Sequence, residues 1–222
     1  MKVGVIVFPG SNCDRDMHHV LTDVFNLQAE FFWHEKNLPS NIDAVVLPGG
    51  FSYGDRLRAG VIAAHSPIIS DVKKLAQKGI LILGVCNGFQ VLTESGLLPG
   101  ALMRNSNLKF VCKNIKLNVE TSSSNFTSCY SKNEIIDTPI AHHDGNYNAD
   151  QNTLDELKNE DRIAFSYVNN PNGSMNNIAG ILSNNRRVLG MMPHPERLND
   201  PMLGGLDGNR LFQSLSESLV TS

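Results

Sequence analysis

Apolar residues in the first half of the chain form short runs separated by stretches with helical spacing. The runs of strand length cover residues 3–8, 29–33, 42–47 and 80–85. Helical spacing is found in Met17, Val20, Leu21, Val24 and Phe25, and again in residues 67–78, which are followed by Gly79 as a helix-ending residue. Strands that alternate with helices predict βαβ units and a parallel sheet. We therefore expect an α/β fold with a doubly wound, mainly parallel sheet.

The second half of the chain has a different pattern. Between residues 109 and 120, apolar and polar positions alternate as in antiparallel strands with one solvated face, the apolar ones being Phe110, Cys112, Ile115, Leu117 and Val119. Residues 178–182 and 187–191 flank Asn184 and Asn185 and predict a hairpin. Residues 207–220 predict a closing amphipathic helix with Asp207 as its N-cap. The parallel core is thus expected to carry a C-terminal antiparallel extension.

Length and charge limit the possible functions. A chain of 222 residues fits one domain, 1–222, better than two. The net charge of -3 gives no basic field for nucleic acid or an anionic membrane surface. No apolar run approaches the roughly 20 residues that a membrane helix needs. We expect a cytoplasmic protein with neither nucleic acid nor a membrane as partner.

The cysteines do not predict a metal site or a disulfide framework. Cys13, Cys86, Cys112 and Cys129 lack both C-x-x-C spacing and the density of a small disulfide scaffold. Reduced thiols and no bound metal are therefore expected.

One cysteine follows a buried strand in a pattern typical of nucleophiles. The run at 80–85 leads into G-x-C-x-G, with Cys86 between Gly84 and Gly88. Glycines at this spacing let a strand and the following helix approach closely around a tight turn, as in G-x-S-x-G hydrolases. The helix dipole favours the thiolate there, and the N–H of Asn87 becomes an oxyanion donor. The alternative is a small buried apolar residue, the usual state of a lone cysteine.

A nucleophilic cysteine needs a base, and His194 is the best placed of the seven histidines. It lies at the end of a predicted strand, between Pro193 and Pro195. In an extended segment Glu196 points to the same side as His194, where it can fix the tautomer and stabilise the imidazolium. H-P-E alone is equally compatible with a solvated turn, but with the cysteine turn it completes a nucleophile, a base and an orienting group.

A third motif, P-G-G, ends the predicted strand at residues 42–47. Ligands of open α/β sheets bind at that carboxyl edge. The N–H of Gly50 is therefore a candidate for the second oxyanion donor, because glycine permits the backbone conformation that points an amide into a site. A tight structural turn explains the same residues.

Together these motifs resemble the class I, or triad-type, glutamine amidotransferases, which share G-x-C-x-G-x-Q, a P-G-G loop and H-P-E. The resemblance spans the whole chain and implies a flavodoxin-like fold. More closely, FPGSNCDRD at residues 8–16, PGGFSYGD at 48–55 followed by LRAG, RNSNLKF at 104–110 and PHPER at 193–197 are similar to the family of glutaminase subunits of phosphoribosylformylglycinamidine synthases. These enzymes act in purine biosynthesis.

The resemblance implies a role for each matching residue. Cys86 attacks the glutamine amide, while His194, oriented by Glu196, protonates the leaving ammonia and then activates water against the thioester. The N–H groups of Gly50 and Asn87 form the oxyanion hole. The expected substrate-side residues are Gln90, Phe51, Asn107 and Leu108, the last two through the backbone that holds the α-groups of glutamine.

The resemblance also implies partners and cofactors. Ammonia passes to a separate large synthetase subunit, often with a small third subunit, which uses ATP and Mg to convert formylglycinamide ribonucleotide to its amidine. This chain contains no G-x-x-x-x-G-K-[ST] phosphate loop. We therefore expect no cofactor in this chain and L-glutamine as its substrate.

One segment and one single residue depart from the family pattern. Residues 141–147 read AHHDGNY where A-H-G-E-G-R/K is expected, so His143, Asp144 and Asn146 differ while His142 is retained. Arg56 replaces an aromatic residue after SYGD. The altered segment is expected near the site or the synthetase interface, with His142 as either a structural residue or a substrate contact.

Three other functions are compatible with part of this pattern. A triad glutaminase could serve another acceptor, in histidine, pyrimidine or folate synthesis, but that chemistry does not require FPGSNCDRD or GGFSYGD. A flavodoxin-like protein with a cysteine elbow and a stress or redox role would place His directly after the Cys, where this chain has Asn87. An inactive partner-binding module is expected to lose a triad residue, and none is lost.

Overall fold

The computed structural model describes residues 1–220, and at its centre lies a nine-stranded sheet of order β2-β1-β3-β4-β11-β10-β9-β6-β7. The parallel part contains β2 (Gln28–Trp33), β1 (Lys2–Val7), β3 (Ala44–Leu47), β4 (Leu81–Val85) and β11 (Val188–Met191). The antiparallel part continues with β10 (Ile178–Leu182), β9 (Ile163–Tyr167), β6 (Val111–Val119) and β7 (Ile135–His142). Two short strands, β5 (Ala101–Met103) and β8 (Asn146–Asn148), form a separate antiparallel pair.

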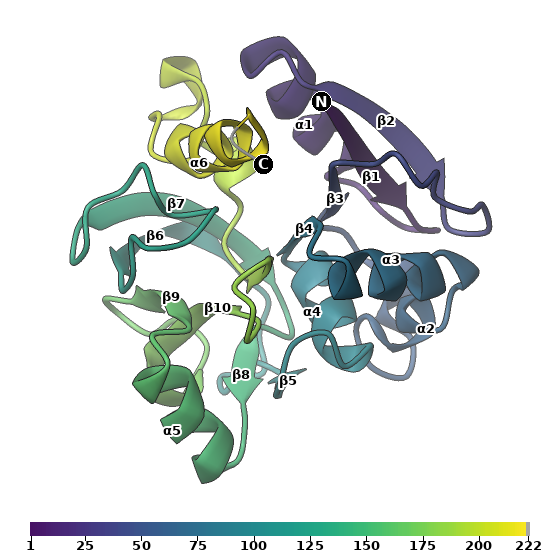
Figure 1. The fold of residues 1–222 in the computed structure, drawn as a ribbon. Coiled ribbons are helices and arrows are strands. Elements are labelled where there is room, and N and C mark those ends of the chain that lie inside the picture. The colour runs from purple at the N-terminus through teal and green to yellow at the C-terminus, as the bar shows by residue number, and fades with distance from the viewer. Residues whose placement is uncertain (221–222) are drawn as a thin grey trace.

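Helices cover both faces of the parallel part (Figure 1). On one side lie α1 (Asp14–His19), which continues into the π-helical turn η1 (Val20–Val24), and the C-terminal α6 (Asn209–Val220). On the other side lie α2 (Val61–Ala64), α3 (Pro67–Gln77) and α4 (Asn87–Glu94). The remaining helix, α5 (Gln151–Asn159), packs on the antiparallel part. Short 3-10 turns cover Ser52–Asp55, Met175–Asn177, Pro195–Arg197 and Pro201–Leu203.

The central parallel strands are apolar on both faces because helices cover both. Every residue of β3, β4 and β11 is buried, as expected for a parallel sheet between two helical layers. The doubly wound α/β fold and its antiparallel extension, predicted from the sequence, are therefore confirmed.

Two glycines let α4 lie directly on the sheet. A Cβ atom on Gly88 would stand 1.9 Å from the carbonyl oxygen of Leu47, and one on Gly84 would stand 2.4 Å from Cδ1 of Leu92. No other residue type fits these spaces without moving α4 away from β3 and β4. This approach fixes the position of Cys86, the residue between strand and helix.

The pairing of β11 with β4 brings distant segments to the same edge of the sheet. The two strands are parallel and place Met191 beside Val85. Because parallel strands end at the same edge, the segment after β11 leaves the sheet next to the turn after β4. This register joins residues 192–197 to Cys86.

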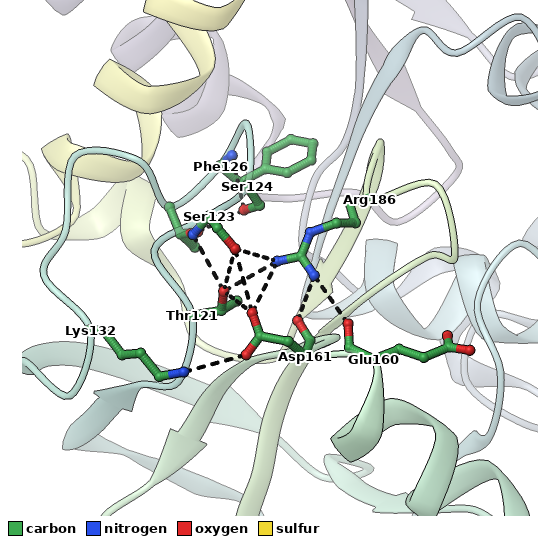
Figure 2. A network of polar contacts seen from close by, with 9 residues as sticks. Thr121, Ser123, Ser124, Phe126, Lys132, Glu160, Asp161 and Arg186 are labelled. Atoms are coloured by element: carbon green, nitrogen blue, oxygen red, sulfur yellow. Dashed lines mark hydrogen bonds and ion pairs between the residues drawn. The ribbon is translucent and has the colours of Figure 1, made fainter.

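A polar network joins three turns of the antiparallel part (Figure 2). Asp161 accepts a hydrogen bond from Thr121 at 2.5 Å and lies 3.6 Å from Nζ of Lys132. Arg186 donates to the carbonyl of Asp161 at 2.7 Å and to Oγ1 of Thr121 at 3.2 Å. The network ties the loop after β6 to the turns that precede β9 and β11.

Several local expectations need correction. Asp207 is not the N-cap of α6, since the helix begins at Asn209 and the Asp207 carboxylate accepts the N–H of Asp137 instead. Phe110 and Cys112 lie on the exposed surface, because the buried positions of β6 start at Ile115. The hairpin of residues 178–191 is confirmed as β10 and β11. Within residues 1–220, no helix is long and apolar enough to cross a membrane.

We predict that Gly88→Ala destabilises the fold by more than about 2 kcal/mol, because the new methyl group would overlap the backbone of β3. Urea unfolding followed by far-ultraviolet circular dichroism measures the change. Gly205→Ala is the matched control, since the atoms nearest to a Cβ there are side-chain atoms of Leu198, at 3.6 Å or more. Equal stability of the two variants would contradict the close approach of α4 to the sheet.

Candidate active site

Cys86 occupies a sharp turn between β4 and α4. Its backbone has φ 51° and ψ -105°, a conformation that costs a non-glycine residue about 1–3 kcal/mol. Its N–H donates to the carbonyl of Met191 at 2.8 Å, which fixes the turn to β11. As the N-cap of α4, Cys86 lies at the positive end of the helix dipole. The tight strand–turn–helix geometry predicted from the sequence is confirmed, and the role of Cys86 as nucleophile stays a prediction.

His194 and Glu196 form a buried pair beside this turn. Nδ1 of His194 and Oε1 of Glu196 are 2.6 Å apart, and their side chains are only 2% and 0% exposed. The N–H of His194 donates to the carbonyl of Pro139 at 2.9 Å, which anchors the segment to β7. The expected extended backbone is wrong, because Pro195–Arg197 forms a 3-10 turn, but the two side chains still meet.

The electrostatic surroundings favour the imidazolium of His194. Burial alone would lower its pKa, but the carboxylate of Glu196 and then the thiol group of Cys86 outweigh burial, so the pKa is raised well above its ordinary value. Nε2 of His194 is buried and makes no hydrogen bond of standard geometry within residues 1–220. This nitrogen is therefore available for a proton transfer involving Cys86.

The two predicted oxyanion donors lie at the ends of β3 and β4. Gly50 has φ 149°, and a Cβ there would stand 2.8 Å from Cα of Ser11, so the position requires glycine. Asn87 opens α4, and N–H groups in a first helical turn have no partner inside the helix. Their role in stabilising an oxyanion stays a prediction.

Gln90 links two loops around the site. Its Oε1 accepts from Nδ2 of Asn87 at 2.9 Å, and its Nε2 donates to the carbonyl of Asp144 at 2.7 Å. Asn87 in turn accepts the N–H of Ser52 at 3.3 Å. Gln90 therefore holds the P-G-G loop and the segment after β7 together, and its contact with substrate stays a prediction.

The other predicted substrate-side residues lie at the surface. Phe51 is 39% exposed, and its ring centroid lies 6.3 Å from that of Phe110. Leu108 is 69% exposed with φ 57°, and Asn107 is also exposed, its Oδ1 accepting the N–H of Lys109. Asn107 and Leu108 lie in one exposed turn, and all three residues remain predicted substrate contacts.

Sequence analysis missed Asn105, which organises this turn. Asn105 is fully buried, and its Nδ2 donates to the carbonyls of Lys109 and His142 at 2.8 and 3.0 Å. Its Oδ1 accepts from the N–H of Gly145 at 3.1 Å and pairs with Nδ1 of His142 at 3.1 Å. Its place inside the RNSNLKF motif was the available signal.

Residues 141–147, the segment that differs from the family pattern, lie next to the site, as the sequence predicted. The Sγ atom of Cys86 lies 3.7 Å from the carbonyl oxygen of Ala141. His142 is 2% exposed, and burial followed by the charge of His194 lowers its pKa to about 4. His142 is thus a neutral imidazole at physiological pH, held by Asn105. Arg56, the other difference from the family pattern, is exposed and does not belong to this group of buried residues.

Asp144 of this segment forms a carboxylate pair with Asp55. Burial followed by the charge of Asp144 raises the pKa of Asp55 to about 6. Oδ1 of Asp55 is buried without a hydrogen-bond partner within residues 1–220, and Asp144 lies 3.5 Å from Nε of Arg104. Asp55 therefore carries a proton more easily than an ordinary carboxyl group.

Comparisons with known proteins show what this chain is similar to. Residues 1–205 match the CobB/CobQ-like glutamine amidotransferase domain family. The chain is 58% identical to the phosphoribosylformylglycinamidine synthase subunit PurQ of Ruegeria pomeroyi, over 99% of each chain, and 55% identical to that of Rhodospirillum rubrum, over 99% and 100%. A chain in the structure of PurLQS from Thermotoga maritima is 42% identical with a TM-score of 0.91, and 98% of each chain is covered.

We predict that the protonated state of Asp55 stabilises the fold. Because the folded pKa of about 6 exceeds the ordinary value of 3.8, stability falls as pH rises between these values and then levels. Asp55→Asn keeps the neutral form, so at pH 7 it should be more stable than the wild type by on the order of 1 kcal/mol, allowing for solvent screening. At about pH 4 the difference should vanish.

Urea unfolding across this pH range tests the prediction. Asp144→Asn is a second test. Removal of the Asp144 charge should lower the pKa of Asp55 and so weaken the pH dependence of stability that Asp55 causes. A difference between Asp55→Asn and wild type that is the same at both pH values would contradict it.

Proposed function

The chain belongs to the CobB/CobQ-like glutamine amidotransferases and, among them, to the glutaminase subunits of phosphoribosylformylglycinamidine synthase; from this premise we propose how its residues carry out the reaction. It hydrolyses glutamine to glutamate and ammonia, and the ammonia serves a synthetase in purine biosynthesis. Relatives more than half identical over the full chain are named as subunits of this enzyme. This finding argues against a glutaminase for another acceptor and against a stress or redox protein.

Cys86 is the nucleophile. Its thiolate attacks the side-chain amide carbon of glutamine, and the carbonyl oxygen gains negative charge in a tetrahedral intermediate. The N–H groups of Gly50 and Asn87 donate hydrogen bonds to that oxygen. Two backbone donors in a buried site stabilise the developing charge without having to reorganise.

His194 moves the protons. Its imidazole takes the thiol proton of Cys86 and delivers it to the departing ammonia as the thioester forms. It then removes a proton from the water that attacks the thioester, and glutamate is released. Glu196 holds the ring through Nδ1, so Nε2 always faces the reacting atoms, and its charge stabilises the imidazolium in both steps.

The observation that carries this proposal is the strained turn of Cys86 next to a fully buried histidine and carboxylate. A buried His and Glu pair costs desolvation free energy that a purely structural role does not require. A non-glycine residue at φ 51° is also costly. Both costs are incurred within one cluster at the carboxyl edge of the sheet, where ligands of this fold class bind.

Other parts of the reaction need a partner. We place ATP and Mg on the large synthetase subunit, with a small third subunit in the complex, and no cofactor on this chain. The similar chain from Thermotoga maritima belongs to a structure named PurLQS, which supports an assembly of this kind. We also place the reaction in the cytoplasm, where reducing conditions keep a nucleophilic thiol free.

We predict that Cys86→Ala abolishes glutamine-dependent amidine formation by the reconstituted complex while leaving ammonia-dependent formation within about twofold of wild type. The change removes the nucleophile but leaves the synthetase intact. Rates are measured with each nitrogen donor in turn. Cys112→Ala, at an exposed position of β6, is the matched control and should keep both activities. Equal loss with both nitrogen donors would remove Cys86 from the proposed role.

A further inference from the structure

The motif FPGSNCDRD, which the glutaminase chemistry leaves unused, packs directly on the catalytic segment. Arg197 of PHPER donates from Nη2 to Sγ of Cys13 at 3.1 Å and from Nε to Oδ2 of Asp16 at 3.1 Å. Cys13 is held to the P-G-G loop as well, through its N–H and the carbonyl of Gly49 at 3.2 Å. The three motifs thus meet around one thiol group.

This thiol group belongs to a compact set of metal-ligand atoms. Cys13, His194 and Glu196 each offer one sulfur, nitrogen or oxygen atom, and the three atoms lie within 4.8 Å of one another. All three residues are buried, at 2%, 2% and 1% exposure. A Cβ on Gly49 would stand 3.0 Å from Sγ of Cys13 and 2.7 Å from Cε1 of His194, so glycine is needed for thiol and imidazole to share this space.

Two polar atoms of this set lack a hydrogen bond of standard geometry. Oε2 of Glu196 is buried without a hydrogen-bond partner within the described part of the chain, and Nε2 of His194 is buried and makes only longer or less aligned contacts with the neighbouring thiol groups. Unsatisfied buried polar atoms are rare and call for an explanation such as an ion or a catalytic role. Catalysis uses Nε2 of His194, but it gives no function to Cys13 or to Oε2 of Glu196.

We propose that Cys13, His194 and Glu196 form an inhibitory site for Zn²⁺ inside the glutaminase centre. One sulfur, one imidazole nitrogen and one carboxylate oxygen are the ligands that zinc binds in proteins, and a site with three protein ligands leaves a fourth position for water. The thiolate and the carboxylate balance the charge of the ion. Coordination displaces the thiol proton and an imidazole proton, which pass to solvent.

Zinc at this position blocks the reaction because it binds the imidazole of His194, the catalytic base. His194 cannot exchange a proton with Cys86 while its imidazole is held by a metal ion. The glutaminase is therefore inhibited while ammonia-dependent synthesis, which bypasses this chain, continues. Because all three ligands are buried, inhibition develops slowly after zinc is added and is reversed by a chelator. The effect on catalysis rests on the proposed roles of Cys86 and His194, but the binding itself does not.

Binding is measured first, on the full chain carrying Cys86→Ala, with Co²⁺ as a spectroscopic probe and Zn²⁺ as competitor. This variant removes the nucleophile and leaves the proposed ligands. We expect a near-ultraviolet thiolate-to-cobalt charge-transfer band that Zn²⁺ displaces. Adding Cys13→Ser should abolish the band and weaken zinc binding by at least about tenfold. Adding Cys112→Ser, at an exposed thiol, should change neither.

The cobalt experiment can overturn the proposed site. Absence of the band in the Cys86→Ala chain, or its persistence after Cys13→Ser, would overturn the site. If Cys13→Ser disturbs the near-ultraviolet circular dichroism of the fold, Glu196→Gln takes its place. That variant should keep the band and bind zinc at least about tenfold more weakly, and unchanged affinity would overturn the site.

Inhibition is then measured on the reconstituted complex. Zn²⁺ should slow glutamine-dependent synthesis with a delayed onset and leave the ammonia-dependent rate unchanged. In the Cys13→Ser complex, the inhibitory zinc concentration, measured against that variant's own uninhibited rate, should rise at least about tenfold. An unchanged inhibitory concentration would overturn the proposal. A chain that binds cobalt through Cys13 but hydrolyses no glutamine would instead contradict the proposed function alone.

Discussion

The backbone of Cys86 is held at positive φ between a buried strand and a buried helix, and the other parts of the site are arranged around it. The conformation persists because Gly84 and Gly88 let α4 approach β3 and β4 to backbone contact. Packing of the whole parallel core therefore supplies the free energy that keeps one residue strained. The hydrogen bond from the Cys86 N–H to Met191 extends the same constraint to β11.

The pairing of the strands places the other groups of the site next to that turn. The parallel pairing of β4 with β11 delivers His194 and Glu196 to the thiol group, and β3 delivers the P-G-G loop to the same edge. Three loops are then joined by side chains rather than by strands, through Asn87, Gln90 and Asn105. The site is consequently rigid on its sheet side and depends on amide hydrogen bonds on its exposed side.

Sequence patterns predicted the parts of this arrangement that are local. Continuous apolar runs identified the parallel strands because both faces are buried, and the glycine spacing identified the turn of Cys86. The edge strand β7 was missed since Pro139 interrupts its pattern, which an edge position tolerates. The helix α5 was also missed, although Asp150 caps it through the N–H of Thr153. The contact of Cys13 with Arg197 spans 184 positions, and no periodicity carries such information.

The central claim is that Cys86 alone among the four cysteines is the activated nucleophile. Its most direct measurement uses a chloroketone analogue of glutamine, in which an electrophilic carbon replaces the amide carbon, followed by peptide mapping by mass spectrometry. We predict one covalent adduct, on Cys86, formed more slowly when glutamine is present and lost in Glu196→Gln. An adduct on the neighbouring Cys13, or labelling that glutamine does not slow, would contradict the account.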